Sequence, residues 1–372
     1  MSKQRLDERA PHPVLVRRLR NQRLTGAPFA SAKDVVSWFG AIQAQDYAGA
    51  KWAIGQRLRA GDDESVDAAF QAGEFIRTHV LRPTWHFVMP ADVRWLLALS
   101  APAIKRKMAY YDQQYGLDEA AFRRTNRLLE SALRDRTLTR DELAQVLSKA
   151  GFALKGPALA QVMLRAELDA LICSGPRRGK QFTYALLEQR APEARRLGRD
   201  EALAELAKRY FTSHGPALVQ DFAWWSGLTI SEATRGIELA KGALESELIA
   251  DKRLWSAPAP RPRAVPSPQV LLLPNYDEYL IAFKDRSFFF DPERLSKLDR
   301  PENVFSNHIV VLDGRVIGGW RRTLDARSAT VEGRVLQALR AEERAAFAAE
   351  AQRFAAFLGR EAAVHQLRET RA

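Results

Sequence analysis

Residues 35–58, VVSWFGAIQAQDYAGAKWAIGQRL, place a polar segment between two apolar ones. The spacing of the apolar side chains predicts one helix that starts at Ser31 and ends near Gln43, and a second helix over 48–60. The polar residues 43–46 (QAQD) are therefore expected on a short connection between two helices. Polar side chains at such a place must bond to their neighbours or face a cleft, so the segment is either a pair of helix caps or a functional site.

The elements that follow repeat one order. Residues 75–81 (FIRTHVL) and 83–88 (PTWHFV) predict two strands after a short helix. Three helices and a two-stranded hairpin then succeed one another, which is the order of a winged helix. The same order is predicted over 139–188, where a helix over 157–173 precedes a basic hairpin, and again over 200–255. Capping boxes of Thr139 with Glu142 and of Thr229 with Glu232 predict the start of a helix in each of these repeats.

The chain changes character after a proline-rich connection, APAPRPRAVPSP, at residues 257–268. Beyond it the pattern is β-rich, with Asp313-Gly314 as a strong type I′ turn signal and a final helix over 342–358. Strands are predicted over 269–283, 308–314, 315–320 and 329–336.

The expected fold class is α+β and mostly helical. Three tandem winged helix-turn-helix modules are expected to form a concave basic cleft, followed by a C-terminal β-rich segment and a closing helix. The expected domains are 1–115 (first winged helix with the Gln-x-Gln motif), 116–196 (second winged helix), 197–268 (third winged helix and proline-rich connection) and 269–372 (β-rich segment with the final helix).

The charge balance of the chain is strongly basic. Its 372 residues carry 57 lysines and arginines against 45 acidic residues, a formal net charge of +12. This excess indicates a polyanionic partner, and the guanidinium fork of arginine suits phosphate. The alternative is an arginine-rich chain whose charged faces are simply solvated. Basic clusters lie at 105–107, 123–124, 177–180 and 321–322.

Several classes of protein find no support in the sequence. Cys173 is the single cysteine, which excludes an intramolecular disulfide, and it is expected to pack as a small hydrophobic side chain. No apolar run reaches the roughly 18 residues of a membrane span, and the N-terminus lacks the apolar centre of a signal peptide, so a cytoplasmic location is expected. The six histidines lack metal-ligand spacing, and there is neither a G-x-x-x-x-G-K-[ST] loop nor a G-x-S-x-G elbow. We therefore expect no metal and no nucleotide cofactor.

Three stretches together resemble a known family. They are AIQAQDYAGAKWAIGQRL (41–58), FIRTHVLRPTWHFVMPADVRWLL (75–97) and LLLPNYDEYLIAFKDR (271–286), and they resemble the AlkZ/YcaQ family of bacterial winged-helix DNA glycosylases over nearly the whole chain. The family motif of glutamine, an apolar residue, then glutamine or aspartate is matched by residues 43–45 in the Gln-x-Gln form, which is more similar to the AlkZ branch. Residues 84–86, Thr-Trp-His, match the Thr-x-His strand.

The resemblance implies a substrate of double-stranded DNA that carries an alkylated purine. A purine alkylated at N7 is cationic, so its glycosidic bond is labile, the base leaves as a neutral molecule and no strong general acid is needed. The enzyme must place a water against the anomeric carbon and stabilise an oxocarbenium-like transition state. A glutamine suits this task because its amide oxygen accepts from the water while its amide nitrogen fixes the orientation. We therefore expect Gln45 to position the water, and Gln43 to orient it or to contact the sugar-phosphate.

Further candidate residues surround this motif. Asp46 is a candidate to stabilise positive charge or to cap the next helix, and Thr84 and His86 alternate on one strand face from which they could reach the cleft. A histidine in a strand is also often a packing residue. Two hairpins are alternative DNA contacts, the basic wing at 177–180 and the turn at 313–315. The DNA-binding candidates are Arg177, Arg178, Lys180, Arg315, Arg321 and Arg322.

The segment 271–286 contains further charged residues. Asp277 and Glu278 are expected to be structural partners of basic groups. Lys284 could in principle form a Schiff base with an abasic sugar, but the resemblance does not imply this, and a monofunctional enzyme that acts as a monomer is expected.

Two other classes of protein fit the helix-turn-helix order. A non-catalytic winged-helix DNA-binding protein or transcription regulator would prefer one DNA sequence, release no base and have no need of the Gln-x-Gln segment. A structural protein whose winged helices bind protein would not bind DNA at any salt concentration.

Overall fold

The first unit of the fold contains the Gln-x-Gln segment. The structure is a computed structural model that describes residues 12–259, 267–290 and 307–369. Helix α2 (Ala32–Phe39) ends at Gly40, whose φ of 77° favours a residue without a Cβ atom. The prediction of a helix reaching Gln43 is therefore wrong, because residues 41–43 form the short strand β1 (Ala41–Gln43) instead. The other elements are α1 (Pro13–Asn21), α3 (Tyr47–Gly55), α4 (Asp63–Ala72), β2 (Ile76–His79) and β3 (Trp85–Val88), with strand order β1-β3-β2.

The second unit repeats this order of elements. A capping box between Thr139 and Glu142 starts α7, as predicted. The predicted helix to residue 173 ends earlier, at Leu168, because Ala170 has a left-handed φ of 57°. Cys173 lies instead on β5, where it is buried as expected. The turn η1 (Pro90–Asp92) and the long helix α5 (Val93–Gln114) lead into this unit. Its elements are α6 (Glu119–Leu133), β4 (Leu138–Thr139), α7 (Arg140–Lys149), α8 (Gly156–Leu168), β5 (Ile172–Ser174), β6 (Thr183–Leu186) and α9 (Leu187–Arg190), with strand order β4-β6-β5.

The third unit follows the same course with a two-stranded sheet. A capping box between Thr229 and Glu232 starts α12, as predicted, and Gly227 ends α11 in the left-handed conformation. A Cβ atom at Gly227 would lie 2.1 Å from the Leu81 carbonyl oxygen, so α11 approaches the β2–β3 turn very closely. The elements are α10 (Arg199–Ser213), α11 (Val219–Ser226), α12 (Ile230–Leu239), η2 (Lys241–Ala243), β7 (Glu245–Ile249) and β8 (Lys252–Ser256).

The C-terminal part is a five-stranded sheet covered by a helix. Asp313 and Gly314 both have positive φ, as a type I′ turn requires. The strand predicted over 269–283 is only half right, because the chain leaves the sheet at Pro274 and forms the short helix α13. The parallel strand β13 was not predicted, and most of the proline-rich connection lies outside the described residues. The elements are β9 (Val270–Leu273), α13 (Glu278–Ile281), β10 (Ile309–Leu312), β11 (Arg315–Leu324), β12 (Ser328–Val335), α15 (Ala341–Phe357) and β13 (Glu361–Glu369), with strand order β13-β12-β11-β10-β9.

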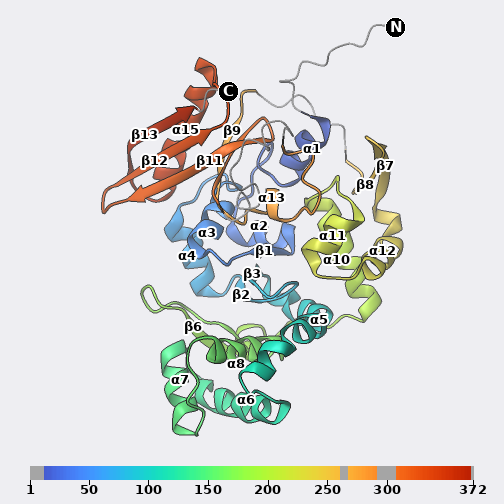
Figure 1. Cartoon of the computed structure of the whole chain (residues 1–372), viewed down its shortest axis with the longest axis vertical. Helices are drawn as coiled ribbons and strands as arrows, with labels where there is room; N and C mark the ends of the chain where they lie inside the picture. The colour runs from blue at the N-terminus through green and yellow to red at the C-terminus, as the bar shows by residue number, and fades with distance from the viewer. Residues whose placement is uncertain (1–11, 260–266, 291–306, 370–372) are drawn as a thin grey trace.

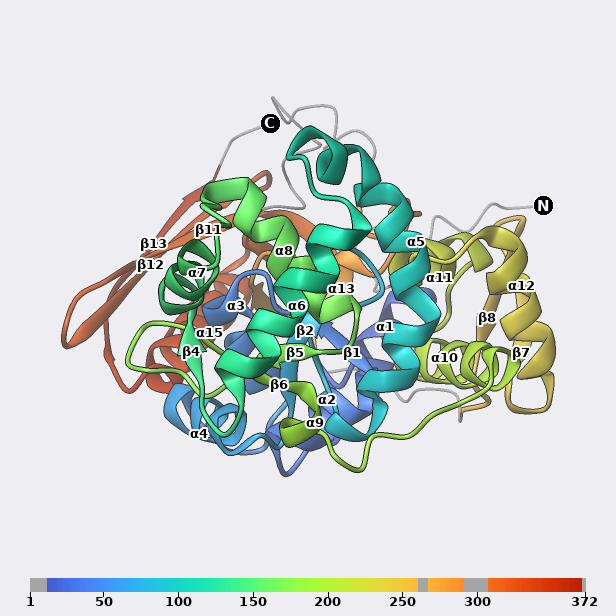
Figure 2. The same ribbon diagram turned by 90° about the horizontal axis from the view of Figure 1, so that it is seen from below.

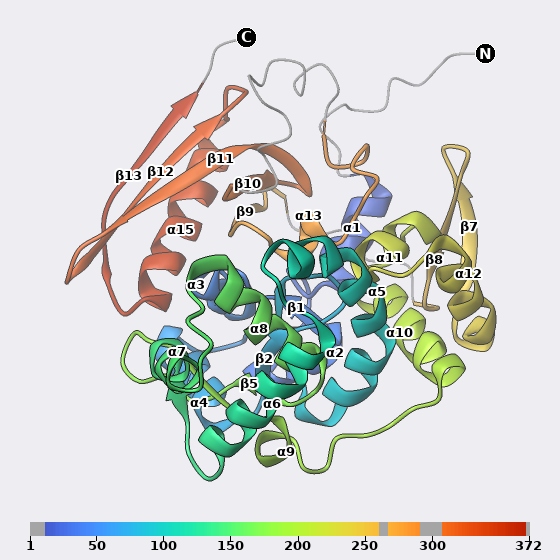
Figure 3. The same ribbon diagram turned by 60° about the horizontal axis from the view of Figure 1, so that its bottom comes forward.

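The packing joins distant parts of the chain around β1. One apolar cluster combines α2, α3 and β3 with β9, β10 and α15, and another combines α1, α10, α11 and α13. Figure 1 shows β1, β3 and α13 together between the C-terminal sheet on one side and the α10–α12 unit on the other. The α6–α9 unit lies beyond β2 and has its own core (Figures 2 and 3). Consequently, Gln43 lies where three parts of the chain meet.

Candidate active site around Gln43

Gln43 is the last residue of β1, which pairs with another strand, β3, along only one of its edges; the other edge is called the free edge. The amide of Ala44 donates to the Trp85 carbonyl at 2.7 Å, so the preceding pair, Gln43 and His86, is a pair without mutual backbone hydrogen bonds. The two side chains of such a pair share one face of the sheet and lie close together. The backbone N–H of Gln43 faces away from β3 and donates to Oε1 of Glu278 at 2.8 Å. At the motif, β1 is therefore held by β3 on one edge and by the Glu278 carboxylate on the free edge.

The carboxamide of Gln43 is also oriented. Its Oε1 accepts from the Arg82 guanidinium at 2.8 Å. Its Nε2 donates none of the hydrogen bonds found within the described part of the chain. Because the oxygen is engaged, Gln43 presents two N–H donors to an approaching ligand. Burial lowers the pKa of Arg82 while the Glu278 charge opposes this, and the group remains a cation at neutral pH.

Gln45 and Asp46 differ in their surroundings. Gln45 is exposed, and its Oε1 makes one long contact of 3.5 Å with the Trp85 amide. Asp46 caps α3, with Oδ1 accepting from the Gly49 amide at 3.1 Å, which is the capping role considered for it in the sequence. Gln45 is therefore the member of the motif whose polar atoms are most accessible to a ligand.

Thr84 and His86 each have a buried polar atom without a protein partner. These atoms are Oγ1 of Thr84 and Nε2 of His86. The His86 Nδ1 lies 2.9 Å from the Thr84 carbonyl oxygen, which can only accept, so Nδ1 carries the proton and Nε2 is an acceptor. Burial and the nearby Arg82 lower the pKa of His86 to about 3. The two atoms are suited to hold a water or a polar ligand atom next to Gln43.

We expect His86 to stay neutral across the working pH range. Nitrogen-15 NMR of labelled protein should show Nδ1 protonated and Nε2 unprotonated from pH 5 to pH 8. The pKa of about 3 in the folded protein lies below the ordinary histidine pKa of 6.5 that applies to the unfolded chain. Between these two pH values the unfolded chain binds an extra proton, so the free energy of unfolding rises with pH over that window. A titration of the His86 ring near pH 6.5 in the folded protein would contradict this assignment.

Residues not selected from the sequence complete the site. Arg82 belongs to the turn between β2 and β3, and Glu278, expected only as a structural partner, starts α13. Trp224 of α11 is 41% exposed, its Nε1 donates to the Ile281 carbonyl at 3.0 Å, and the Arg82 guanidinium lies 5.7 Å from its ring centre. In the sequence, Arg82 and Glu278 are visible only as charged residues within 75–97 and 271–286, two of the stretches that resemble the family. Only the fold brings these residues to Gln43.

The candidate DNA contacts lie apart from one another. In the wing between β5 and β6, Arg177 packs on Tyr47 and its backbone amide donates to Gln71 at 2.6 Å, whereas Arg178 pairs with Glu142 at 2.8 Å. Lys180 is exposed at the same wing. On β11, Arg315 is half-buried, Arg321 has an 86% exposed side chain, and Arg322 lies over Phe354. Arg177 thus braces the second unit against the first, and the Arg321 side chain is more exposed than that of Arg178, which is 53% exposed.

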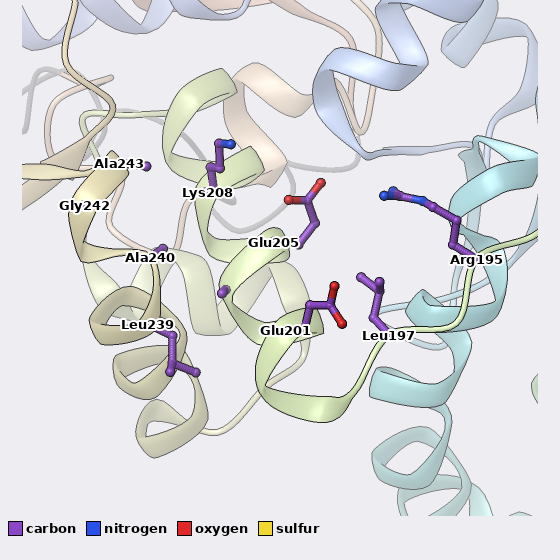
Figure 4. A pocket seen from close by; sticks show the side chains of 10 residues that line it. Arg195, Leu197, Glu201, Glu205, Lys208, Leu239, Ala240, Gly242 and Ala243 are labelled. Atoms are coloured by element: carbon purple, nitrogen blue, oxygen red, sulfur yellow. The ribbon is translucent and has the colours of Figure 1, made fainter.

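Three pockets formed by described residues have linings that include none of Gln43, Arg82 and Glu278. One pocket of about 350 Å³ lies between α10 and the end of α12, with Glu201, Lys208 and Leu239 among its lining (Figure 4). None of its lining residues belongs to β1, β3 or α13. Within residues 12–259, 267–290 and 307–369, no three histidine, cysteine, aspartate or glutamate side chains gather as metal ligands, and no helix is both long and apolar enough to cross a membrane.

Comparison with known proteins identifies the class. The family model described as DNA glycosylase AlkZ-like matches residues 36–357, and the chain belongs to this family of DNA glycosylases. A curated relative is the interstrand DNA cross-link repair glycosylase of Streptomyces sahachiroi, which is 26% identical over 326 residues, 82% of this chain and 86% of the relative. The solved structure of Streptomyces sahachiroi DNA glycosylase AlkZ shares the fold, with a TM-score of 0.79 at 22% identity over 96% of this chain and 98% of that one. The α+β fold class and the family resemblance of the sequence are thereby confirmed.

Proposed function

We propose that this DNA glycosylase hydrolyses the N-glycosidic bond of N7-alkylated purines in duplex DNA, including bulky or interstrand-crosslinked lesions. The observation that supports the proposal most is the Gln43–Gln45 motif at the free end of β1, beside Arg82 and the unpartnered polar atoms of Thr84 and His86. The cross-link repair activity in the name of the Streptomyces sahachiroi relative supports the choice of lesion.

In the proposed mechanism the two glutamines have different tasks. The accessible Oε1 of Gln45 accepts from a water and directs it at the anomeric carbon. Gln43, whose Oε1 is held by Arg82, donates from Nε2 to the sugar-phosphate or to that water. Departure of the neutral base leaves an oxocarbenium-like sugar, which the water captures, and the released proton passes to solvent. The polar atoms next to Gln43, Oγ1 of Thr84 and Nε2 of His86, act as acceptors that stabilise the transient positive charge on the sugar.

The binding mode proposed is that of three winged helices along one duplex. The support is the order helix, strand or bridge, helix, helix, hairpin, which is repeated three times in 12–259. We propose that the basic cleft formed by these modules holds the DNA, with 1–115, 116–196 and 197–268 as the modules and 269–372 as the β-rich segment. Phosphate contacts would come from Arg178, Lys180, Arg315, Arg321 and Arg322, and Arg177 would hold the wing in place.

The protein would act as a monomer that needs no nucleotide cofactor, and it would be associated with the nucleoid when bound to DNA.

We expect the exposed cation of β11 to contribute to DNA binding. An Arg321→Ala variant should reduce the slope of log K against log salt by about 0.9 in magnitude, because one phosphate contact is lost. Arg321 lies 3.9 Å from Glu332, so a Glu332→Ala control on β12 should raise the affinity instead. Fluorescence anisotropy with labelled duplex at several salt concentrations measures both, and an unchanged slope for Arg321→Ala would remove β11 from the interface.

The class of activity is tested with duplex that carries N7-methylguanine. We expect breaks at the lesion after alkali treatment and no breaks or borohydride-trapped protein before it, because a monofunctional glycosylase leaves an intact abasic site. The rival function, a winged-helix transcription regulator, predicts tight binding to one undamaged sequence without base release. Such binding with no alkali-labile site would support the rival.

A further inference from the structure

Glu278 is a buried carboxylate in an unusual environment. It is 2% exposed and accepts from three donors that come from two units of the fold. These are the Gln43 amide at 2.8 Å, Trp225 Nε1 at 2.9 Å and His214 Nε2 at 3.3 Å. The first belongs to the first unit, and the other two belong to the third unit. Glu278 therefore ties the edge of β1 to α10 and α11.

The neighbouring residue shows what a purely structural carboxylate looks like in this fold. Asp277 receives both outer nitrogens of Arg57 at 2.9 Å, so its charge is neutralised by contact. No lysine or arginine of the described residues forms an ion pair with Glu278. Burying a charge without a contacting counter-charge is costly, so the hydrogen bonds that Glu278 accepts must stabilise its charge.

Glu278 is nevertheless expected to be ionised. Burial alone raises the pKa of its carboxyl group, but the hydrogen bond and the charge interaction with His214, together with the hydrogen bond from the Gln43 amide, outweigh burial and hold the pKa below its usual value. Burial also lowers the pKa of His214, while the hydrogen bond with Glu278 opposes this. Its Nε2 lies 3.3 Å from the Glu278 carboxylate, and its Nδ1 lies 2.8 Å from the Ser213 hydroxyl, which donates to the Arg209 carbonyl. The negative charge thus persists in the interior.

We propose that Glu278 is a positioning residue of the glycosylase site whose ionised carboxylate holds Gln43 at the free edge of β1 and places a negative charge behind the point where the sugar becomes cationic. The inference rests on the proposed function, because the cationic transition state belongs to base release. Two effects follow from the one group. The hydrogen bond sets the place of Gln43, and the charge lowers the energy of the transition state relative to the ground state.

A Glu278→Gln variant separates the charge from the hydrogen bond. Its amide oxygen can still accept from the Gln43 amide, while its amide nitrogen faces the Trp225 Nε1–H and loses that hydrogen bond, so the contact to Gln43 is kept and the charge is lost. We expect kcat for N7-methylguanine release to fall on the order of 10- to 100-fold with KM and DNA affinity unchanged. An Asp277→Asn control should lower the unfolding temperature yet keep the rate per folded molecule, because Asp277 faces Arg57 and not Gln43.

The pH profile provides a second readout that does not depend on this variant. Wild-type kcat should persist below pH 4.5 and fall only as Glu278 becomes protonated, after subtraction of enzyme-free base loss. Trp225→Phe removes one donor from the carboxylate, so the acid limb of kcat should move to higher pH.

The outcomes of these experiments are distinct. If the wild type releases no base, the proposed function fails. If the wild type releases base and Glu278→Gln equals it in kcat, the inference about Glu278 is overturned while the function stands. If Glu278→Gln does not fold, the pH profile of kcat for Trp225→Phe tests the inference instead. An acid limb at the same pH as in the wild type would then overturn the inference.

Discussion

A Gln45→Ala variant is expected to lose base release almost completely while it stays folded. The rate of N7-methylguanine release should fall on the order of 100- to 1,000-fold, because a side chain that positions the attacking water contributes mainly to the transition state. The side chain is exposed and makes one contact of 3.5 Å, so its removal should change the free energy of unfolding by less than about 0.5 kcal/mol. Single-turnover kinetics and thermal unfolding measure the two quantities.

The matched control for this variant is a glutamine of similar exposure elsewhere. Gln113 on α5 is exposed and belongs to none of the contacts around β1, so Gln113→Ala should release base at the wild-type rate. Wild-type release by a folded Gln45→Ala protein would remove Gln45 from the mechanism. In that case Gln43 and His86, which face the same side of the sheet, would be the remaining candidates to hold the water.

The second large effect concerns stability. Asp277→Ala should lower the free energy of unfolding by about 3–5 kcal/mol, because it leaves the Arg57 guanidinium buried without its counter-charge. The side chains of Arg57 and Asp277 are 2% and 1% exposed, and two hydrogen bonds of 2.9 Å join them. Arg57 also donates to the Gln22 and Ala53 carbonyls, so the pair joins α1, α3 and the start of α13.

Chemical denaturation with urea measures this loss, and an exposed ion pair supplies the comparison. Asp200 and Arg235 form a salt bridge with side chains 53% and 56% exposed, so Asp200→Ala should cost much less stability than Asp277→Ala. An Asp277→Ala protein as stable as Asp200→Ala would show that the buried pair does not hold the C-terminal segment against the first unit.

The sequence predicted those elements whose signals are local. The capping boxes at Thr139 and Thr229 and the turn at Asp313-Gly314 depend on residues within a few positions of each other, and each was predicted correctly. The strand β1 was missed because its three residues continue the apolar pattern of α2, and its strand conformation comes from pairing with β3, more than forty residues away. The parallel strand β13 depends in the same way on β12.

The site shows the same division between local and non-local information. The Gln-x-Gln motif and Thr84-x-His86 were found as separate stretches, and the register of β1 and β3 shows that Gln43 and His86 are direct partners. Glu278 and Arg82 could not be assigned to Gln43 from the sequence, because a carboxylate or guanidinium far along the chain carries no sign of its partner. Asp277, expected to pair with a basic group, pairs with Arg57, and this expectation is confirmed.

Free N7-methylguanine released from a duplex, quantified by mass spectrometry with enzyme in excess, decides most directly whether this chain cleaves the glycosidic bond of alkylated purines. The expected result is free base in an amount equal to the abasic sites formed, well above the enzyme-free background, and release near background for Gln45→Ala. Bound duplex with no free base above background from the wild-type protein would contradict the proposed function.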